Sequence, residues 1–237
     1  MANDKQTPGN KRMLQASGYF AEGKYKKADN EYTAAITAYK SDSPVNTNRV
    51  ALALFTQVHL RLKGMLEGDA TELIQEGLRL SEEDDTPTLR RFHALFHLQA
   101  ASHSRLVGEC DNAMAFVRKA ADLLSQNGEM ADRFELHQEE SLIHLQNKDW
   151  ESSQSAARCT LDCAQHPEQR LAAQFLMAEC KEAAGDASGA LTTLERAEAI
   201  VSDHKIQGGT KQLKERRADL IERHPKLDDT TDDSEWI

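Results

Sequence analysis

Apolar residues recur at steps of three and four along most of the chain, the spacing that places them on one face of an α-helix. The pattern is clearest in five segments, at residues 14–39, 50–66, 90–107, 133–146 and 171–184. Runs of Val, Ile or Thr alternating with polar residues, which mark strands, are absent from the sequence. The pattern therefore predicts an all-α fold of five antiparallel helix pairs and a final helix near residues 211–224.

Prolines and short polar residues predict where some of these helices begin. A Ser or Thr followed by proline is typical of an N-cap with proline at the first helical position. An acidic residue with Glu three positions later has the spacing of a capping box. These signals occur at Ser43-Pro44, at Thr86-Pro87 and at Asp69 with Glu72.

The second helix of every pair carries the same stripe: a small residue, a larger residue four positions later and a small residue seven positions later. Small side chains let two helix backbones approach, and the larger residue between them fills the neighbour's groove. Five residues before each stripe is a turn position, which is glycine in three pairs and suits a left-handed helix cap. The stripes are Ala28, Tyr32, Ala35; Ala70, Ile74, Gly77; Ala113, Val117, Ala120; Ser153, Ala157, Thr160; and Ala190, Leu194, Ala197, and the turn positions are Gly23, Met65, Gly108, Lys148 and Gly185.

With Ala16, Tyr19 and Tyr25, the first pair (GYFAEGKYKKADNEYTAAI, residues 18–36) closely resembles a tetratricopeptide repeat, and residues 108–124 and 177–200 are partial matches. The first stripe residues are 37 to 43 positions apart, whereas the family period is about 34. The chain is therefore more similar to long-period variants such as those of kinesin light chains or bacterial activator domains. The resemblance implies an α-solenoid with a right-handed superhelix, with repeats over 9–203, a capping helix over 204–225 and disordered ends at 1–8 and 226–237.

The same resemblance implies that the first helix of each pair lines a concave groove that binds a partner. Its expected groove residues are Met13, Ser17 and Phe20; Phe55, His59 and Leu62; Leu98, Ser102 and Arg105; Gln138, Leu142 and Leu145; and Phe175, Glu179 and Glu182. For any one of these residues, packing between helices is an equally good interpretation.

Composition limits the class of partner. The 237 residues carry a formal charge of -10, and the mean hydropathy is -0.65. No apolar stretch has the length of a membrane span, and the polar N-terminus lacks the apolar core of a secretory signal. A basic face for nucleic acid is not supplied by this charge balance. We expect a cytoplasmic protein, with the nucleus also compatible, that binds other proteins and neither membrane nor nucleic acid.

Motifs for catalysis or cofactor binding are missing. The sequence has no GxxxxGK[ST], GxGxxG or GxSxG pattern. His93 and His97 have the spacing of a zinc-protease pair, but Ala94 stands where the catalytic Glu is needed. Cys159, Cys163 and His166 share one predicted helix face and could offer three zinc ligands, with His144 or Cys180 as a distant fourth. One rigid helix rarely brings such ligands together tetrahedrally, so we expect no metal, no cofactor and no enzyme.

The C-terminal residues are strongly acidic and end in Glu235, Trp236 and Ile237. A tryptophan beside acids resembles short motifs that dock into grooves, and the alternative is a solubilising tail. A sharper hypothesis is that the tail docks into the protein's own groove and competes with partners.

These observations favour a non-catalytic adaptor or scaffold that binds a peptide or helix of a partner protein. Two alternatives stay open. One is a constitutive structural subunit of a multiprotein complex, and the other is a small-molecule- or metal-responsive regulator that uses the Cys159, Cys163 and His166 face.

Overall fold

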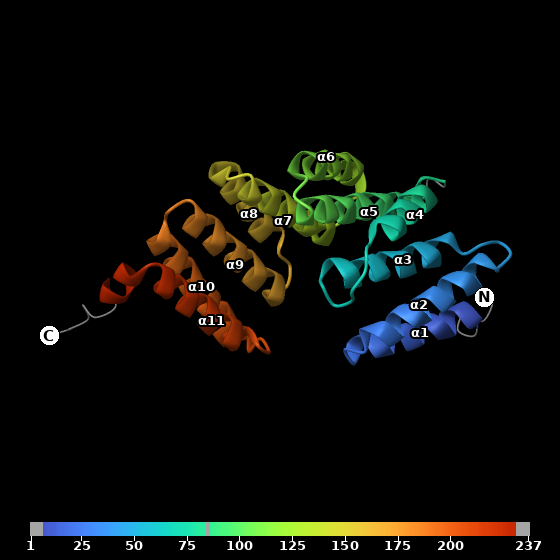
Figure 1. The fold of residues 1–237 in the computed structure, drawn as a ribbon, viewed down its shortest axis with the longest axis horizontal. Coiled ribbons are helices and arrows are strands. Elements are labelled where there is room, and N and C mark those ends of the chain that lie inside the picture. The colour runs from blue at the N-terminus through green and yellow to red at the C-terminus, as the bar shows by residue number, and fades with distance from the viewer. Residues whose placement is uncertain (1–6, 84–85, 231–237) are drawn as a thin grey trace. The chain divides into compact units, whose positions relative to one another are not determined.

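The computed structural model describes residues 7–83 and 86–230, where all regular secondary structure is helical (Figure 1). These residues form eleven α-helices and a final 3-10 helix, and no strand occurs among them. The predicted all-α class and helix number are therefore confirmed. No helix in these ranges is long and apolar enough to cross a membrane.

The α-helices follow one another through short connections. Their bounds are α1 Pro8–Ala21, α2 Tyr25–Lys40, α3 Thr47–Leu62, α4 Thr71–Glu82, α5 Pro87–Leu106, α6 Cys110–Asn127, α7 Met130–Gln146, α8 Trp150–Cys163, α9 Pro167–Ala183, α10 Ala187–His204 and α11 Gly209–Arg223; the 3-10 helix η1 spans Pro225–Thr230.

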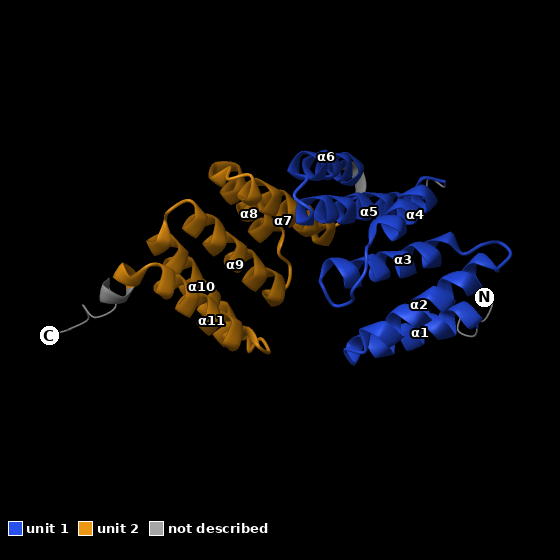
Figure 2. Ribbon diagram, in the orientation of Figure 1, with its two compact units in different colours: residues 1–128 blue, residues 129–237 orange. Residues whose placement is uncertain are grey.

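The chain divides into two compact units, residues 1–128 and residues 129–237 (Figure 2). The first unit contains α1 to α6, and the second contains α7 to α11 and η1. Within the units, packing is most extensive between α1 and α2, α5 and α6, α7 and α8, and α9 and α10. These are four of the five predicted helix pairs; in the second, α3 packs less extensively on α4 than on α2. The boundary between the two units falls after the third pair.

The predicted stripe is buried at every position in all five pairs. Its tightest approach lies between α4 and α5, where a Cβ added to Gly77 would meet a ring carbon of Phe96 at 2.3 Å. Phe96 is completely buried. The ring therefore occupies the space that any side chain at position 77 would need.

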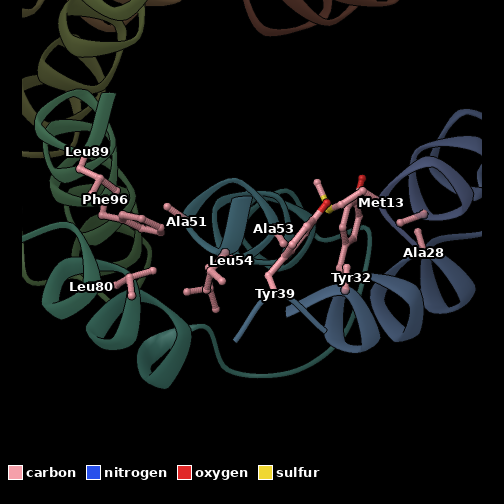
Figure 3. Close-up of a cluster of buried hydrophobic side chains, with 13 residues drawn as sticks. Met13, Ala28, Tyr32, Tyr39, Ala51, Ala53, Leu54, Leu80, Leu89 and Phe96 are labelled. Carbon is pink, nitrogen blue, oxygen red and sulfur yellow. The ribbon is translucent and has the colours of Figure 1, made fainter. Parts of the chain in front are cut away.

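The core of the first unit links helices α1 to α5 (Figure 3). Met13 of α1 and the two tyrosines of α2, Tyr32 and Tyr39, lie at one end, and Leu80 and Phe96 lie at the other. Because every helix of the series contributes to one apolar cluster, each pair is held by its neighbour as well as by its own partner helix.

A polar network joins α2 to α3 beside this core. Arg61 donates from both terminal nitrogens to the carboxylate of Asp29, at 3.0 and 3.1 Å. Gln57 Nε2 donates to the same carboxylate at 2.8 Å. The bidentate geometry fixes the orientation of α3 on α2 as well as their distance.

In the fourth pair, hydroxyl groups replace the alanines of the stripe. Ser153 Oγ donates to the carbonyl oxygen of Ser141 at 3.0 Å, and Ser141 Oγ donates to that of Ser153 at 2.9 Å. Cys180 Sγ of α9 lies 3.0 Å from Ser153 Oγ. All three side chains are completely buried. The departure from the repeat pattern is therefore compensated by hydrogen bonds between α7, α8 and α9.

Residues in the left-handed region end the first helix of each pair. Gly23, Gly108 and Gly185 have φ values of 71°, 86° and 85°, as expected for such caps, and Lys148 adopts the same conformation at 60°. In the second pair the prediction of Met65 was wrong by one residue, because Gly64 takes this role with φ 66°.

The predicted helix starts are right in one case and wrong in two. Thr86 Oγ1 accepts from the N–H of Leu89 at 3.3 Å, ahead of Pro87 at the start of α5. Pro44 does not begin α3, because Asn46 is its N-cap. Asp69 is also not an N-cap: Ala70 holds that position in α4, and the Asp69 carboxylate accepts from the Thr71 N–H at 3.0 Å.

Part of each end that was predicted to be disordered has regular structure. Thr7 caps α1, which begins at Pro8. Pro225–Thr230 form η1, and Leu227 packs against the core of the second unit. The candidate docking motif at residues 235–237 lies outside the described residues.

We expect opposite effects from the same substitution at two helical glycines of the first unit. Gly77→Ala should destabilise the protein by about 1–3 kcal/mol, because the new methyl group overlaps Phe96. Gly18→Ala on α1 meets no atom within 4 Å and should stabilise by about 0.5–1 kcal/mol, because alanine favours helix. Urea unfolding followed by circular dichroism measures both, and effects of equal sign would contradict this packing.

Candidate functional site

Helices α9, α10 and α11 of the second unit enclose a pocket of about 620 Å³. Its buried residues are apolar and form the floor, whereas most of the charged residues are exposed and form the rim. The floor consists of Ala178, Ala190, Leu194 and Leu220, and the remaining lining residues are Glu179, Glu182, Gln212, Glu215, Arg216, Asp219 and Arg223.

A second pocket of about 380 Å³ adjoins the first, because Glu179, Glu182 and Arg223 line both. It extends to Trp150 of α8 and to His224 after α11. We call the two pockets together the α9–α11 groove. Its volume lies in the range of sites that bind ligands or peptide side chains.

Glu182 is the most enclosed charge of this groove, with its side chain 16% exposed. One carboxylate oxygen lies 3.2 Å from Arg223 Nη2, and the other lies 3.1 Å from His224 Nε2. These contacts join the C-terminal end of α9 to the C-terminal end of α11 and so hold the walls of the groove together.

Arg216 covers the aromatic ring of Phe175. The guanidinium carbon lies 4.6 Å from the ring centroid, within the distance of a cation–π contact. Phe175 itself is only 6% exposed. The guanidinium group of Arg216 is therefore exposed in the groove at this position. Phe175, which was predicted to line the groove, lies buried beneath it.

The expected groove residues of the first unit are mostly used for helix packing. Phe55 contacts Phe92 and Phe96 with ring centroids 6.3 and 6.2 Å apart, and Leu98 is buried. Met13 is also buried, Ser17 is exposed, and Phe20, His59, Leu62, Ser102 and Arg105 are half-buried like Phe55.

In the second unit, the predicted residues that line the groove are Leu145, Glu179 and Glu182. Leu142 packs against the apolar cluster of α8 and α9, and Gln138 is half-buried. The first helix of the fifth pair, α9, thus borders the groove through the predicted Glu179 and Glu182.

The sequence analysis assigned residues 204–225 only to a capping helix and so missed the contribution of α11 to the groove. Gln212, Arg216, Asp219 and Arg223 are spaced by four, three and four residues. That spacing places them on one face. This spacing is the feature of the sequence that could have predicted the groove wall, since all four residues line the groove.

The structure gathers no metal site from the cysteines. No group of three or more His, Cys, Asp or Glu residues suited to holding an ion occurs in the described ranges. Burial, with a smaller effect of Cys159, raises the pKa of the Cys163 thiol and so disfavours the thiolate that a metal requires. His166 is exposed, and its backbone N–H donates to Oε1 of Gln169 at the start of α9.

The two histidines of α5 pack against each other in the first unit. His97 is 7% exposed, stacks on Phe116 and lies edge-on to His93 at 4.7 Å between centroids. Within the described part of the chain, its Nδ1 has no hydrogen-bond partner. Burial, aided by the charges of His93 and Lys119, lowers the pKa of His97 to about 4.

Comparison with known proteins supports the architecture. The chain is similar in structure to BtubC (BKLC) from P. vanneervenii, with a TM-score of 0.64 and 17% sequence identity. The match covers 82% of this chain and 80% of that chain. No protein-family model matches the sequence, and no curated protein does. At this identity the similarity concerns the fold alone.

We expect His97 to make the first unit sensitive to acid. Its pKa is lower in the folded chain than the ordinary value of about 6.5, so the folded state resists protonation. The contribution of His97 to stability is complete above that value and falls by up to about 3 kcal/mol as the pH drops from about 6.5 to about 4. His97→Phe should remove this part of the acid sensitivity, and the exposed His204→Phe should retain it. Urea unfolding at several pH values is the measurement, and identical pH profiles of His97→Phe and the parent protein would contradict it.

Proposed function

We propose that this chain is a non-catalytic adaptor whose α9–α11 groove binds a peptide or helix of a partner protein. The observation that carries the proposal is the combination of an apolar floor with a charged rim on rigidly packed helices. Such a floor contributes affinity by burying apolar surface, and the rim selects among partners by charge.

The sequence pattern supports the same class of function. The buried stripe and the left-handed turns are features of tetratricopeptide-like repeats with a long period, and such repeats use their faces to hold other proteins. We include membership of that superfamily, and the right-handed superhelix it implies, in the proposal.

The lining of the groove favours binding over catalysis. None of the residues that line its two pockets is Ser, Thr, Cys or Lys, so the groove offers none of the usual side-chain nucleophiles apart from carboxylates and His224. His224 and the best-enclosed carboxylate, Glu182, contact each other. These groups are therefore engaged in holding α9 to α11.

Photo-crosslinking in the source cell tests the proposal. Benzoylphenylalanine replaces Gln212, which lines the groove, or Lys214, which is exposed on the same helix and does not. We expect discrete cross-linked products from position 212 and at least about fivefold less from position 214, because groove binding buries one side of α11.

Two results would contradict the adaptor. Equal cross-linking from both positions would indicate a chain enclosed on all sides, as in a constitutive subunit of a larger complex. Absence of products from position 212, with the full-length variant present and folded, would show that the groove is unoccupied in the cell.

A further inference from the structure

We propose that the α9–α11 groove selects a cationic amphipathic segment, with Lys or Arg side chains beside apolar ones, and excludes acidic segments. This inference rests on the proposed function, since it names the chemistry of the segment that the groove would bind. Three independent features of the second unit carry it: the pairing state of the rim charges, the distribution of charge along the chain and the character of the floor.

The rim has more carboxylates than cations. Glu179, Glu182, Glu215 and Asp219 face Arg216 and Arg223. The cations are already engaged, Arg223 with Glu182 and Arg216 with the ring of Phe175. An incoming anion would have to displace these contacts.

Three of the carboxylates keep capacity for a new cation. Among the described residues, the side chains of Glu179 and Asp219 take part in no ion pair. Glu215 has only a long contact of 3.7 Å with the exposed Lys211. A guanidinium or ammonium group placed between them would gain attractive partners without breaking an existing pair.

The distribution of charge along the chain also favours a cationic segment. Residues 1–128 contain 16 Lys or Arg and 16 Asp or Glu, so the second unit carries the whole formal charge of -10. A unit of this charge attracts cationic segments and repels anionic ones before contact.

The C-terminal tail contains five acidic residues after position 227. Its charge therefore makes it a poor occupant of this groove, which argues against the predicted intramolecular docking.

The apolar floor of the groove determines which side chains the bound segment needs besides its cations. Ala178, Ala190, Leu194 and Leu220 are each at most 6% exposed and present a narrow apolar surface between the charged walls. Apolar side chains, or the methylene stems of Lys and Arg, can lie on such a surface while the charged ends reach the rim. A simple polycation would satisfy the rim but leave the floor uncovered.

Binding of two labelled peptides to the full chain tests this inference. Both peptides have Leu or Ala at steps of three and four; one has Lys at the remaining positions and the other has Glu. Fluorescence anisotropy measures their affinity for the parent chain and for two variants. The groove variant is Glu179→Lys with Asp219→Lys, and the control is Glu195→Lys with Asp203→Lys on exposed positions of α10 that do not line the groove.

Both variants change the net charge equally, so any difference between them reports the site. We expect the Lys peptide to bind about tenfold more weakly to the groove variant and within about twofold of the parent to the control. Circular dichroism melting establishes that each variant is folded. If both variants weaken binding equally, or the Glu peptide binds the parent as tightly as the Lys peptide, the inference is overturned.

The outcome separates this inference from the proposed function. If cross-links from position 212 persist while the Lys peptide shows no preference for the groove, the chain is an adaptor of different specificity. If the cross-links are also absent, the proposed function fails as well.

Discussion

The close approach of paired helices is the constraint on which the rest of this structure depends. Each second helix presents small residues at two positions seven apart, and every one of them is buried. Gly77 shows how little space remains, since the ring of Phe96 lies where its Cβ would be. Where the fourth pair uses Ser153 instead of alanine, reciprocal hydrogen bonds with Ser141 satisfy the hydroxyl groups. The helices can therefore approach with or without alanine, provided that no polar group is buried unpaired.

The groove of the second unit follows from the same packing rule. Helix α11 packs against α10, and among the described residues only the short η1 follows it. Its apolar positions, Leu213 and Leu220, are buried, while Glu215, Arg216, Asp219 and Arg223 line the groove. The ion pairs of Glu182 hold this arrangement. Arg216 stacks on Phe175, so that the surface above the buried ring is positively charged. A helix that completes the core thus also provides one wall of a binding site.

Local periodicity was sufficient to predict the helices, because the stripe and the turn glycines depend only on residues close in sequence. The prediction failed around the longer connection between α3 and α4. There Ala70 is the N-cap in place of Asp69, and Gly64 adopts the left-handed conformation in place of Met65. It also failed for Phe175 and Leu98, since the helix pattern gives the face of a residue but not what covers it. Arg216 lies 41 positions after Phe175, and such a contact leaves no periodic trace in the sequence.

The central claim is that the α9–α11 groove is occupied by a partner in the cell. Carbodiimide labelling of carboxyl groups, read by mass spectrometry, tests it without knowledge of the partner. Glu179 and Asp219 are exposed in the isolated chain, as are Glu195 and Asp203 outside the groove. The account predicts that source-cell lysate reduces the labelling of Glu179 and Asp219 and leaves that of Glu195 and Asp203 unchanged. Unchanged labelling of the two groove residues would contradict it.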